Sequence, residues 1–196
     1  MAWYEITTAE IAPRQPLDAE LFKKIRSNFI VGISAIGLPQ VIPNGSFEYS
    51  TGTVPSLWTI SSFTGGSASI STGAHGANSL KITHPGTAAG ANYGGAAVYT
   101  DDFIAVGGTA ISIQGIFWAS NTAVKGGLAW RSYDKDQTII ATGATNHSSY
   151  TSTPTTIAIL CTYTTDTRFI KVGCFSGTDG TAAGSLYFDG LYIYNT

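Results

Sequence analysis

The sequence predicts an all-β protein, an antiparallel β-sandwich that is preceded by a short arm and one helix. Charged residues make up 11% of the 196 residues, whereas 43% are hydrophobic and 23 are glycine. From residue 40 onward, short apolar runs alternate with clusters of Gly, Asn, Asp and Ser. Few charges and closely spaced turn residues are typical of proteins built from many short strands. The chain is long enough for one domain with a real core and a short appendage.

About nine strands are expected where β-branched and aromatic residues gather between turn signals. They cover residues 67–72, 79–84, 96–100, 110–118, 127–133, 138–142, 156–163, 168–175 and 185–194. In one of them Ile111 and Ile113 alternate with Ser112 and Gln114, as in a strand with one face more buried than the other. So many strands with no helical segment among them favour two packed sheets of the jelly-roll kind, over residues 38–196.

Residues 1–37 are expected to form a separate anchor. An extended arm comes first, and a helix is predicted over residues 18–29, with Asp18 as its N-cap. The expected contact residues of this anchor are its bulky apolar side chains. They are Trp3, Tyr4, Ile6, Leu17, Leu21, Phe22, Ile25 and Phe29. A helix of about a dozen residues is marginal alone in water, so its apolar stripe must pack on the sandwich, on sister copies or on a larger assembly.

The two cysteines lie in neighbouring apolar runs, Cys161 in residues 157–163 and Cys174 in residues 169–175. If these runs pair as a hairpin through residues 164–167, the sulfurs come close enough for a disulfide, given a suitable register. In a cytosolic chain such cysteines are more often buried thiols. Both alternatives stay open at the level of the sequence.

Charge and composition argue against several classes of function. The formal net charge is −2, and no basic cluster resembles the footprint of a nucleic-acid-binding protein. No apolar run approaches the length that spans a bilayer, and the N-terminus lacks the features of a signal peptide. His75, His84 and His147 have no second His at a metal-ligand spacing, and no nucleophile elbow or phosphate loop is present. We expect a protein that is made in the cytoplasm and is not an enzyme.

Several patches in the sandwich resemble carbohydrate-binding modules of the family 4 and 9 type. The first is Asn-Gly-Ser-Phe-Glu at 44–48, followed by Trp58. The others are Gly-Ala-Asn-Ser-Leu-Lys-Ile at 76–82, a strand, turn and strand at 129–140, and Leu-Tyr-Phe-Asp at 186–189. Their order and spacing extend over the whole predicted sandwich. The resemblance implies a jelly roll that binds sugars through aromatic side chains.

The resemblance also implies particular site residues. The expected sugar-binding residues are Trp118, Trp130, Tyr133 and Tyr99, on or near predicted strands, although aromatics this numerous mostly build a core. Trp130 and Tyr133 are an odd number of residues apart, so a regular strand directs them to opposite faces and at most one belongs to the core.

In the family, a structural calcium ion is often held by an acid of the first patch and an acid of the last. Here those acids are Glu48 and Asp189. The family commonly has two adjacent acids in the last patch, whereas residue 190 is Gly. The alternative is that Glu48 and Asp189 only accept hydrogen bonds from loop amides.

The anchor segment is similar to N-terminal arms of tailed-phage virion proteins, through an aromatic-Ile-Thr start, Pro-Leu-Asp at 16–18 and Lys-Ile-Arg-Ser-Asn at 24–28. This resemblance implies a virion structural protein, a head decoration, collar or tail appendage, that is assembled in the bacterial cytoplasm as a homotrimer and attached to other virion proteins. The alternative is a free carbohydrate-binding module for adhesion or polysaccharide capture. Cell-surface or mucosal glycans are the expected ligands in either case.

Overall fold

The computed structural model describes residues 40–62, 64–86, 94–106, 108–147, 151–176 and 182–195. The predicted arm, the predicted helix and the eight anchor residues lie outside these ranges, so the anchor stays a prediction. Within the described ranges the chain consists of strands, turns and loops. None of the described segments forms a helix that is long and apolar enough to cross a membrane.

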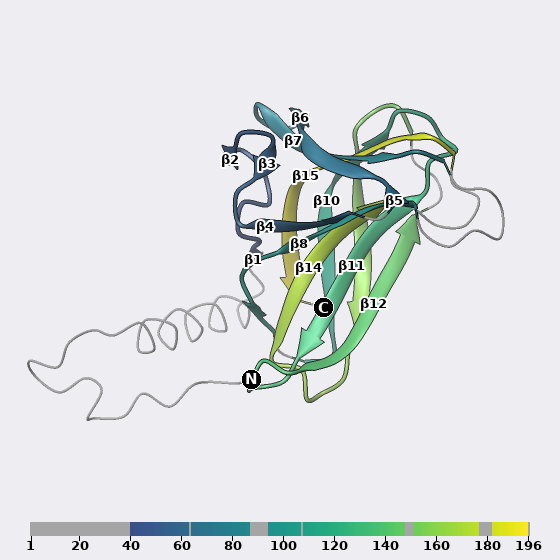
Figure 1. Ribbon diagram of the computed structural model, residues 1–196. Coiled ribbons are helices and arrows are strands. Elements are labelled where there is room, and N and C mark those ends of the chain that lie inside the picture. The colour runs from purple at the N-terminus through teal and green to yellow at the C-terminus, as the bar shows by residue number, and fades with distance from the viewer. Residues whose placement is uncertain are drawn as a thin grey trace, which may run out of the picture.

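The described chain is an antiparallel jelly-roll β-sandwich of two large sheets (Figure 1). The six-stranded sheet has the order β13 (Thr155–Thr162), β10 (Ala110–Ala119), β15 (Gly184–Asn195), β7 (Asn78–His84) and β6 (Ser67–Thr72), and β1 (Gln40–Val41) pairs with β15. The seven-stranded sheet has the order β12 (Ile139–His147), β11 (Gly126–Tyr133), β14 (Phe169–Ser176), β8 (Gly94–Thr100) and β4 (Trp58–Ser62). In this second sheet β9 (Ile104–Ala105) pairs with β14, and β5 (Thr64–Gly65) pairs in parallel with β8. A small hairpin of β2 (Ser50–Thr51) and β3 (Val54–Pro55) completes the described fold.

The predicted strands are present at the expected places. Eight of the nine differ from the observed strands by two residues or fewer at either end, and the remaining one, β12, extends to His147 instead of residue 142. Strand β4 was not predicted, because Trp58–Ser62 is short and three of its five residues are Ser or Thr. The sequence analysis also missed the two-residue strands, which carry no periodic pattern.

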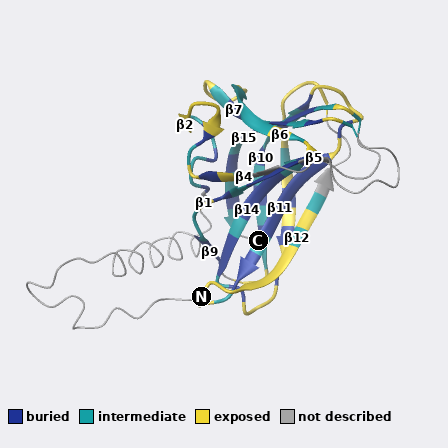
Figure 2. Ribbon diagram, in the orientation of Figure 1, coloured by how far each residue is buried: buried dark blue, intermediate teal, exposed yellow. Residues whose placement is uncertain are grey.

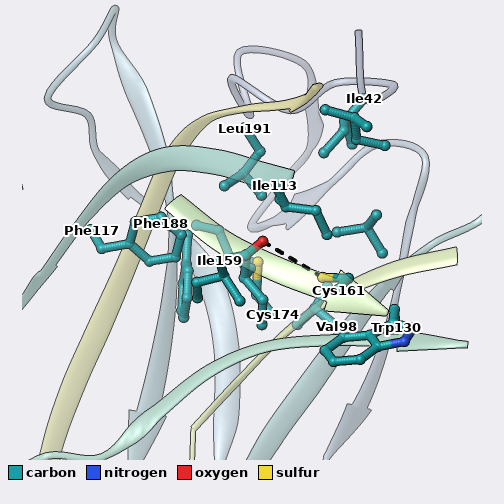
Figure 3. Close-up of a cluster of buried hydrophobic side chains, with 14 of the residues drawn as sticks. Ile42, Val98, Ile113, Phe117, Trp130, Ile159, Cys161, Cys174, Phe188 and Leu191 are labelled. Carbon is teal, nitrogen blue, oxygen red and sulfur yellow. Dashed lines mark hydrogen bonds between the residues drawn. The ribbon is translucent and has the colours of Figure 1, made fainter. Parts of the chain in front are cut away.

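The hydrophobic core lies between the two large sheets (Figure 3). Along β10 the side chains alternate between buried and half-buried for the whole length of the strand, so Ile113 and Phe117 face the core. Phe117 meets Phe188 of β15 edge to face, with ring centroids 5.3 Å apart. Full burial of such a side chain stabilises the fold by about 1.5–3 kcal/mol. The alternating pattern of β10 therefore fixes which of its faces is turned outward. Strands β11 and β14 are buried along most of their length (Figure 2).

The hairpin that would bring the two cysteines together does not form. Cys161 pairs with Ile111 in the six-stranded sheet, whereas Cys174 pairs with Leu128 in the seven-stranded sheet. Residues 164–167 therefore carry the chain from one sheet to the other. The apolar faces of both strands pack in the core between the sheets, and each strand forms its hydrogen bonds with strands other than its neighbour in sequence. Both cysteines are free and buried. Of the two alternatives, the structure therefore has buried thiols and no disulfide.

Candidate functional site

One face of the seven-stranded sheet is turned away from the core and carries aromatic and cationic side chains. Leu128 and Trp130 of β11 and Val172 of β14 belong to the core cluster. Because side chains alternate along a strand, the residues between them point outward. We use the term outer face for the outward residues of β8, β11 and β14. They are Ala97, Tyr99, Gly127, Ala129, Arg131, Tyr133, Phe169, Lys171, Gly173 and Phe175.

Small residues in the middle of the outer face make room for a tyrosine ring. Tyr99 pairs with Gly173, which in turn pairs with Ala129 across β8, β14 and β11. A methyl group on Gly173 would lie 2.6 Å from carbon atoms of the Tyr99 ring, closer than a real Cβ contact. The ring therefore rests directly on the glycine backbone. The guanidinium carbon of Arg131 lies 4.1 Å from the centre of the same ring, which is a cation–π distance.

A second aromatic group lies at the end of the outer face where β9 pairs with β14. Tyr133 and Phe169 are directly paired across β11 and β14, and they pack with Ala105 of β9. The half-buried Phe103 contacts Tyr133 edge to face, with ring centroids 4.8 Å apart. The Nζ atom of Lys171 lies 4.7 Å from the centre of the Phe103 ring. Two ring-and-cation pairs thus lie at the outer face, Tyr99 with Arg131 and Phe103 with Lys171.

The four predicted sugar-binding residues do not form a single cluster. Tyr99 and Tyr133 both lie on the outer face. Trp118 lies on the other sheet, where its ring stacks on Tyr187 at 5.0 Å and 4°. Trp130 is 9% exposed, belongs to the core cluster and packs against Gly143 of β12. As expected for an odd interval, Trp130 and Tyr133 point to opposite faces of β11.

The sequence analysis did not identify Arg131, Phe103 or Lys171 as site residues. The motif at 129–140 contains Arg131, but nothing in it shows what lies opposite that side chain. The pairing of β11 with β14 places Arg131 beside Lys171, forty residues further along the chain. Strand alternation could have predicted that Arg131 and Tyr133 share a face, whereas the partner across the sheet depends on the topology.

The two predicted calcium ligands hold one loop, residues 73–77. The Oδ2 atom of Asp189 accepts hydrogen bonds from the backbone N–H groups of Ala74 and His75, at 2.9 and 2.6 Å. The Oε1 atom of Glu48 accepts hydrogen bonds from the N–H groups of Ala77 and Asn78, at 3.0 and 3.2 Å. In the structure both carboxylates therefore accept hydrogen bonds from loop amides, which is the alternative to calcium binding.

The other oxygen of Asp189, Oδ1, is a candidate ligand for a cation. Oδ1 is buried and has no hydrogen-bond partner among the described residues. Burial raises the pKa of the Asp189 carboxyl, although the amides of His75 and Ala74 act in the opposite direction. Among the described residues there is no group of three or more His, Cys, Asp and Glu that could hold a metal. Calcium binding here would therefore use Glu48 and Asp189 together with carbonyl or water oxygens.

The rest of the first patch has a structural role. The Asn44 side chain donates hydrogen bonds to the carbonyls of Tyr49 and Ser56, both at 2.7 Å, and accepts one from the Tyr49 N–H at 3.1 Å. Trp58 donates from its indole nitrogen to the Pro43 carbonyl at 3.1 Å. These bonds close the loop that carries Glu48. Residues of this patch therefore position the Glu48 and Asp189 loop site rather than the outer face.

A pocket of about 470 Å³ lies beside this loop site, on the six-stranded sheet. Its lining includes His75, Ile116, Tyr192 and Tyr49, and the Tyr49 side chain is 74% exposed. Asn44 also lines the pocket, but its side-chain amide is hydrogen-bonded to the loop backbone. Asn44 thus contributes no free amide to the pocket, whereas Tyr49, His75 and Tyr192 remain on its lining.

Solved structures share this fold, whereas no protein-family model and no curated protein matches the sequence. A family 11 carbohydrate-binding module from Clostridium thermocellum, solved with a mixed-linked tetrasaccharide, has a TM-score of 0.57 at 13% identity and covers 79% of this chain and 94% of its own. A carbohydrate-binding module, TmCBM61, solved with β-1,4-galactotriose, has a TM-score of 0.51 at 13% identity and covers 80% of this chain and 99% of its own.

A domain structure of tailspike protein 4 from bacteriophage CBA120 is similar to the same degree. Its TM-score is 0.57 at 13% identity over 79% of this chain, and the match spans 21% of the tailspike chain. A match to an α-L-arabinofuranosidase has a TM-score of 0.54 and spans 26% of that enzyme. At these identities the similarity demonstrates the jelly-roll fold alone.

Proposed function

We propose that the sandwich is a non-catalytic glycan-binding module and that its ligand lies on the outer face. The observation that carries this proposal is the pair of half-buried rings, Tyr99 and Phe103, each with a cation beside it, next to the small residues of this face. Aromatic rings provide flat apolar surfaces for the faces of sugar rings, and the flanking cations supply hydrogen-bond donors for hydroxyl groups. The sugar-binding modules of the same fold support the proposal.

The close carboxylates of the sequence support a role without catalysis. The Oδ1 atom of Asp134 accepts hydrogen bonds from the backbone N–H groups of Asp136 and Thr138, so Asp134 closes its own turn. Asp136 is paired with Lys135 at 2.6 Å. A glycosidase needs two carboxyl groups facing each other across a substrate, and these residues lie within one turn.

Binding to a glycan array, with Tyr99→Ala as the site variant and Tyr187→Ala as the matched control, tests the proposal. Tyr187 lies on the six-stranded sheet, stacked on Trp118. We expect Tyr99→Ala to lower the affinity for the bound glycan about tenfold or more, the loss of one ring contact of roughly 1–2 kcal/mol. Tyr187→Ala should bind as the wild type does. Equal affinities for all three proteins would reject the outer face as the site.

We further propose that the sandwich is displayed on a phage particle through residues 1–37, as a trimeric decoration, collar or tail appendage. The resemblance of the N-terminal segment to virion arms supports this, and so does the shared fold of a phage tailspike domain. Several copies on one particle would raise a weak glycan affinity by avidity. Cryo-electron microscopy of particles from the source should reveal density for the sandwich. Particles without it would favour the free carbohydrate-binding module.

Finally, we propose that a structural calcium ion joins Glu48 and Asp189. The buried Oδ1 atom of Asp189, which has no hydrogen-bond partner among the described residues, supports this. When bound, the ion would supply a positive charge that compensates the buried carboxylate and would link the first loop to β15.

A further inference from the structure

We infer that the ligand of the outer face is an anionic glycan, a sugar chain that bears carboxylate or sulfate groups. This inference rests on the glycan-binding function proposed above and specifies the class of sugar. It depends on the two cations of the outer face, Arg131 and Lys171, and on what surrounds them.

The seven-stranded sheet contains basic residues but no acidic ones in its described strands. Strands β4, β5, β8, β9, β11, β12 and β14 contain no Asp and no Glu, and their charged residues are Arg131 and Lys171. The whole chain has a formal net charge of −2, with twelve acidic and ten basic residues. The strands of the outer face therefore carry two positive charges and no negative one, while Asp101, Asp102 and Asp134 lie in the adjoining turns. The two charges favour the approach of an anion to the middle of the face.

Arg131 and Lys171 are direct cross-strand partners in the pairing of β11 with β14. Both side chains are half-buried and point to the outer face. Like charges directly opposite each other destabilise a sheet, so the pair has an unfavourable energy unless an anion lies between them. A fold that needed only packing at these positions could use neutral residues. Two adjacent cations are thus better explained by a ligand than by stability.

Neither cation is neutralised by a carboxylate of the described chain. Arg131 lies over the Tyr99 ring and Lys171 over the Phe103 ring, whereas the ion pair found among the described residues joins Lys135 and Asp136. Asp101, in the loop after β8, accepts a hydrogen bond from Thr59 instead. The donor groups of both cations are thus available beside the rings.

This arrangement matches the chemistry of an acidic sugar. A guanidinium group binds a carboxylate or sulfate through two parallel hydrogen bonds, and an ammonium group adds a point charge. The neighbouring Tyr99 and Phe103 rings, which the two cations overlie, would then border the sugar rings that carry those groups. A neutral glycan would use the rings but would leave the two positive charges without a counter-charge.

Two measurements on the full chain test the inference. The first is binding to a glycan array with hexuronate-bearing, sialate-bearing, sulfated and neutral oligosaccharides, and the second is titration. Polygalacturonate and its methyl ester serve as a matched pair, because esterification removes the charge and keeps the backbone. The site variant is Arg131→Gln with Lys171→Gln, and the control is Lys81→Gln on β7 of the other sheet. We expect the full chain to bind charged glycans and to bind them more weakly at high salt. The affinity of the site variant for these glycans should be lower by about tenfold or more.

The outcomes separate this inference from the proposed function. Preference for carboxylate-bearing or for sulfated glycans supports it and identifies which anion is bound. If the protein binds neutral glycans, and this binding is lost in Tyr99→Ala but unchanged in the double Gln variant, the anionic-glycan inference is overturned. The proposed glycan-binding function is then still supported. Absence of binding to every glycan overturns both.

Discussion

Cys161 and Cys174 illustrate how burial controls the chemistry of single residues. Both thiols lie in the core, on opposite sheets, and Cys161 donates a long hydrogen bond of 3.8 Å to the carbonyl of Ile159. Burial raises the pKa of Cys161 from an ordinary value of 9.0 to about 12, and it raises the pKa of Cys174 well above 9.0. The folded protein therefore keeps both thiols neutral at a pH where the unfolded chain has ionised them.

This difference predicts a loss of stability in alkali. Above about pH 9 the unfolded chain releases thiol protons that the folded chain retains, so the free energy of unfolding falls as the pH rises. The slope approaches about 1.4 kcal/mol per pH unit for each buried thiol as the pH rises well above 9. Urea unfolding at several pH values between about 8.5 and 10 measures it. Cys161→Ser should show a shallower slope than the wild type, and an unchanged slope would contradict the burial of this thiol.

The side-chain placements show which residues the sequence could and could not predict. Alternation along β11 correctly separated Trp130 from Tyr133, because strand periodicity is a local property. The placement of Trp118 beside Tyr187, and of Arg131 beside Lys171, depends on strand partners that are distant in the sequence. Sequence patterns carry no information about these partners, so the sugar-binding prediction mixed residues from both sheets and from the core.

Among the structural elements, the loop of residues 73–77 depends most on specific polar contacts. Gly76 has a φ of +93° there, a conformation that favours glycine. The two carboxylates of Glu48 and Asp189 together accept hydrogen bonds from four backbone N–H groups of this loop and the start of β7. The loop before β2 and the last strand, β15, are thus joined through residues 73–78.

The calcium proposal predicts a specific change in thermal stability. Addition of calcium to protein treated with a chelator should raise the melting temperature, because the ion binds the folded loop and not the unfolded chain. Differential scanning calorimetry measures the shift. Asp189→Asn should abolish the shift, whereas Asp166→Asn, in an exposed turn between the sheets, should retain it. If calcium leaves the melting temperature of the wild type unchanged, the two carboxylates are bound by loop amides alone.

Strand positions could be predicted from the sequence, but strand partners could not. The nine predicted strands all exist, because each combines β-branched or aromatic residues with flanking turn residues. Strands β13 and β14 do not form a hairpin, because a jelly roll pairs strands across long connections. Short connections favour hairpins in general, and here the connection at 164–167 crosses between the layers instead.

At the scale of the whole molecule, the division between anchor and sandwich is the main prediction still to be tested. The described core extends from Ile42 to Ile193 and contains residues from both large sheets. A protein that lacks residues 1–37 should therefore keep its β-sheet circular dichroism and melt within a few degrees of the full chain. It should also no longer attach to particles that the full chain binds. Unfolding of the shortened protein would contradict the two-part organisation.

The central claim is that a glycan binds on the outer face, and mapping of backbone amide shifts by NMR tests it most directly. Titration with the best glycan from the array should move the amide signals of Ala97, Ala129 and Gly173, which lie on adjacent strands of that face. The signals of His75 and Tyr192, which line the pocket on the other sheet, should stay in place. Shifts confined to the pocket residues would contradict the account and move the binding site to the six-stranded sheet.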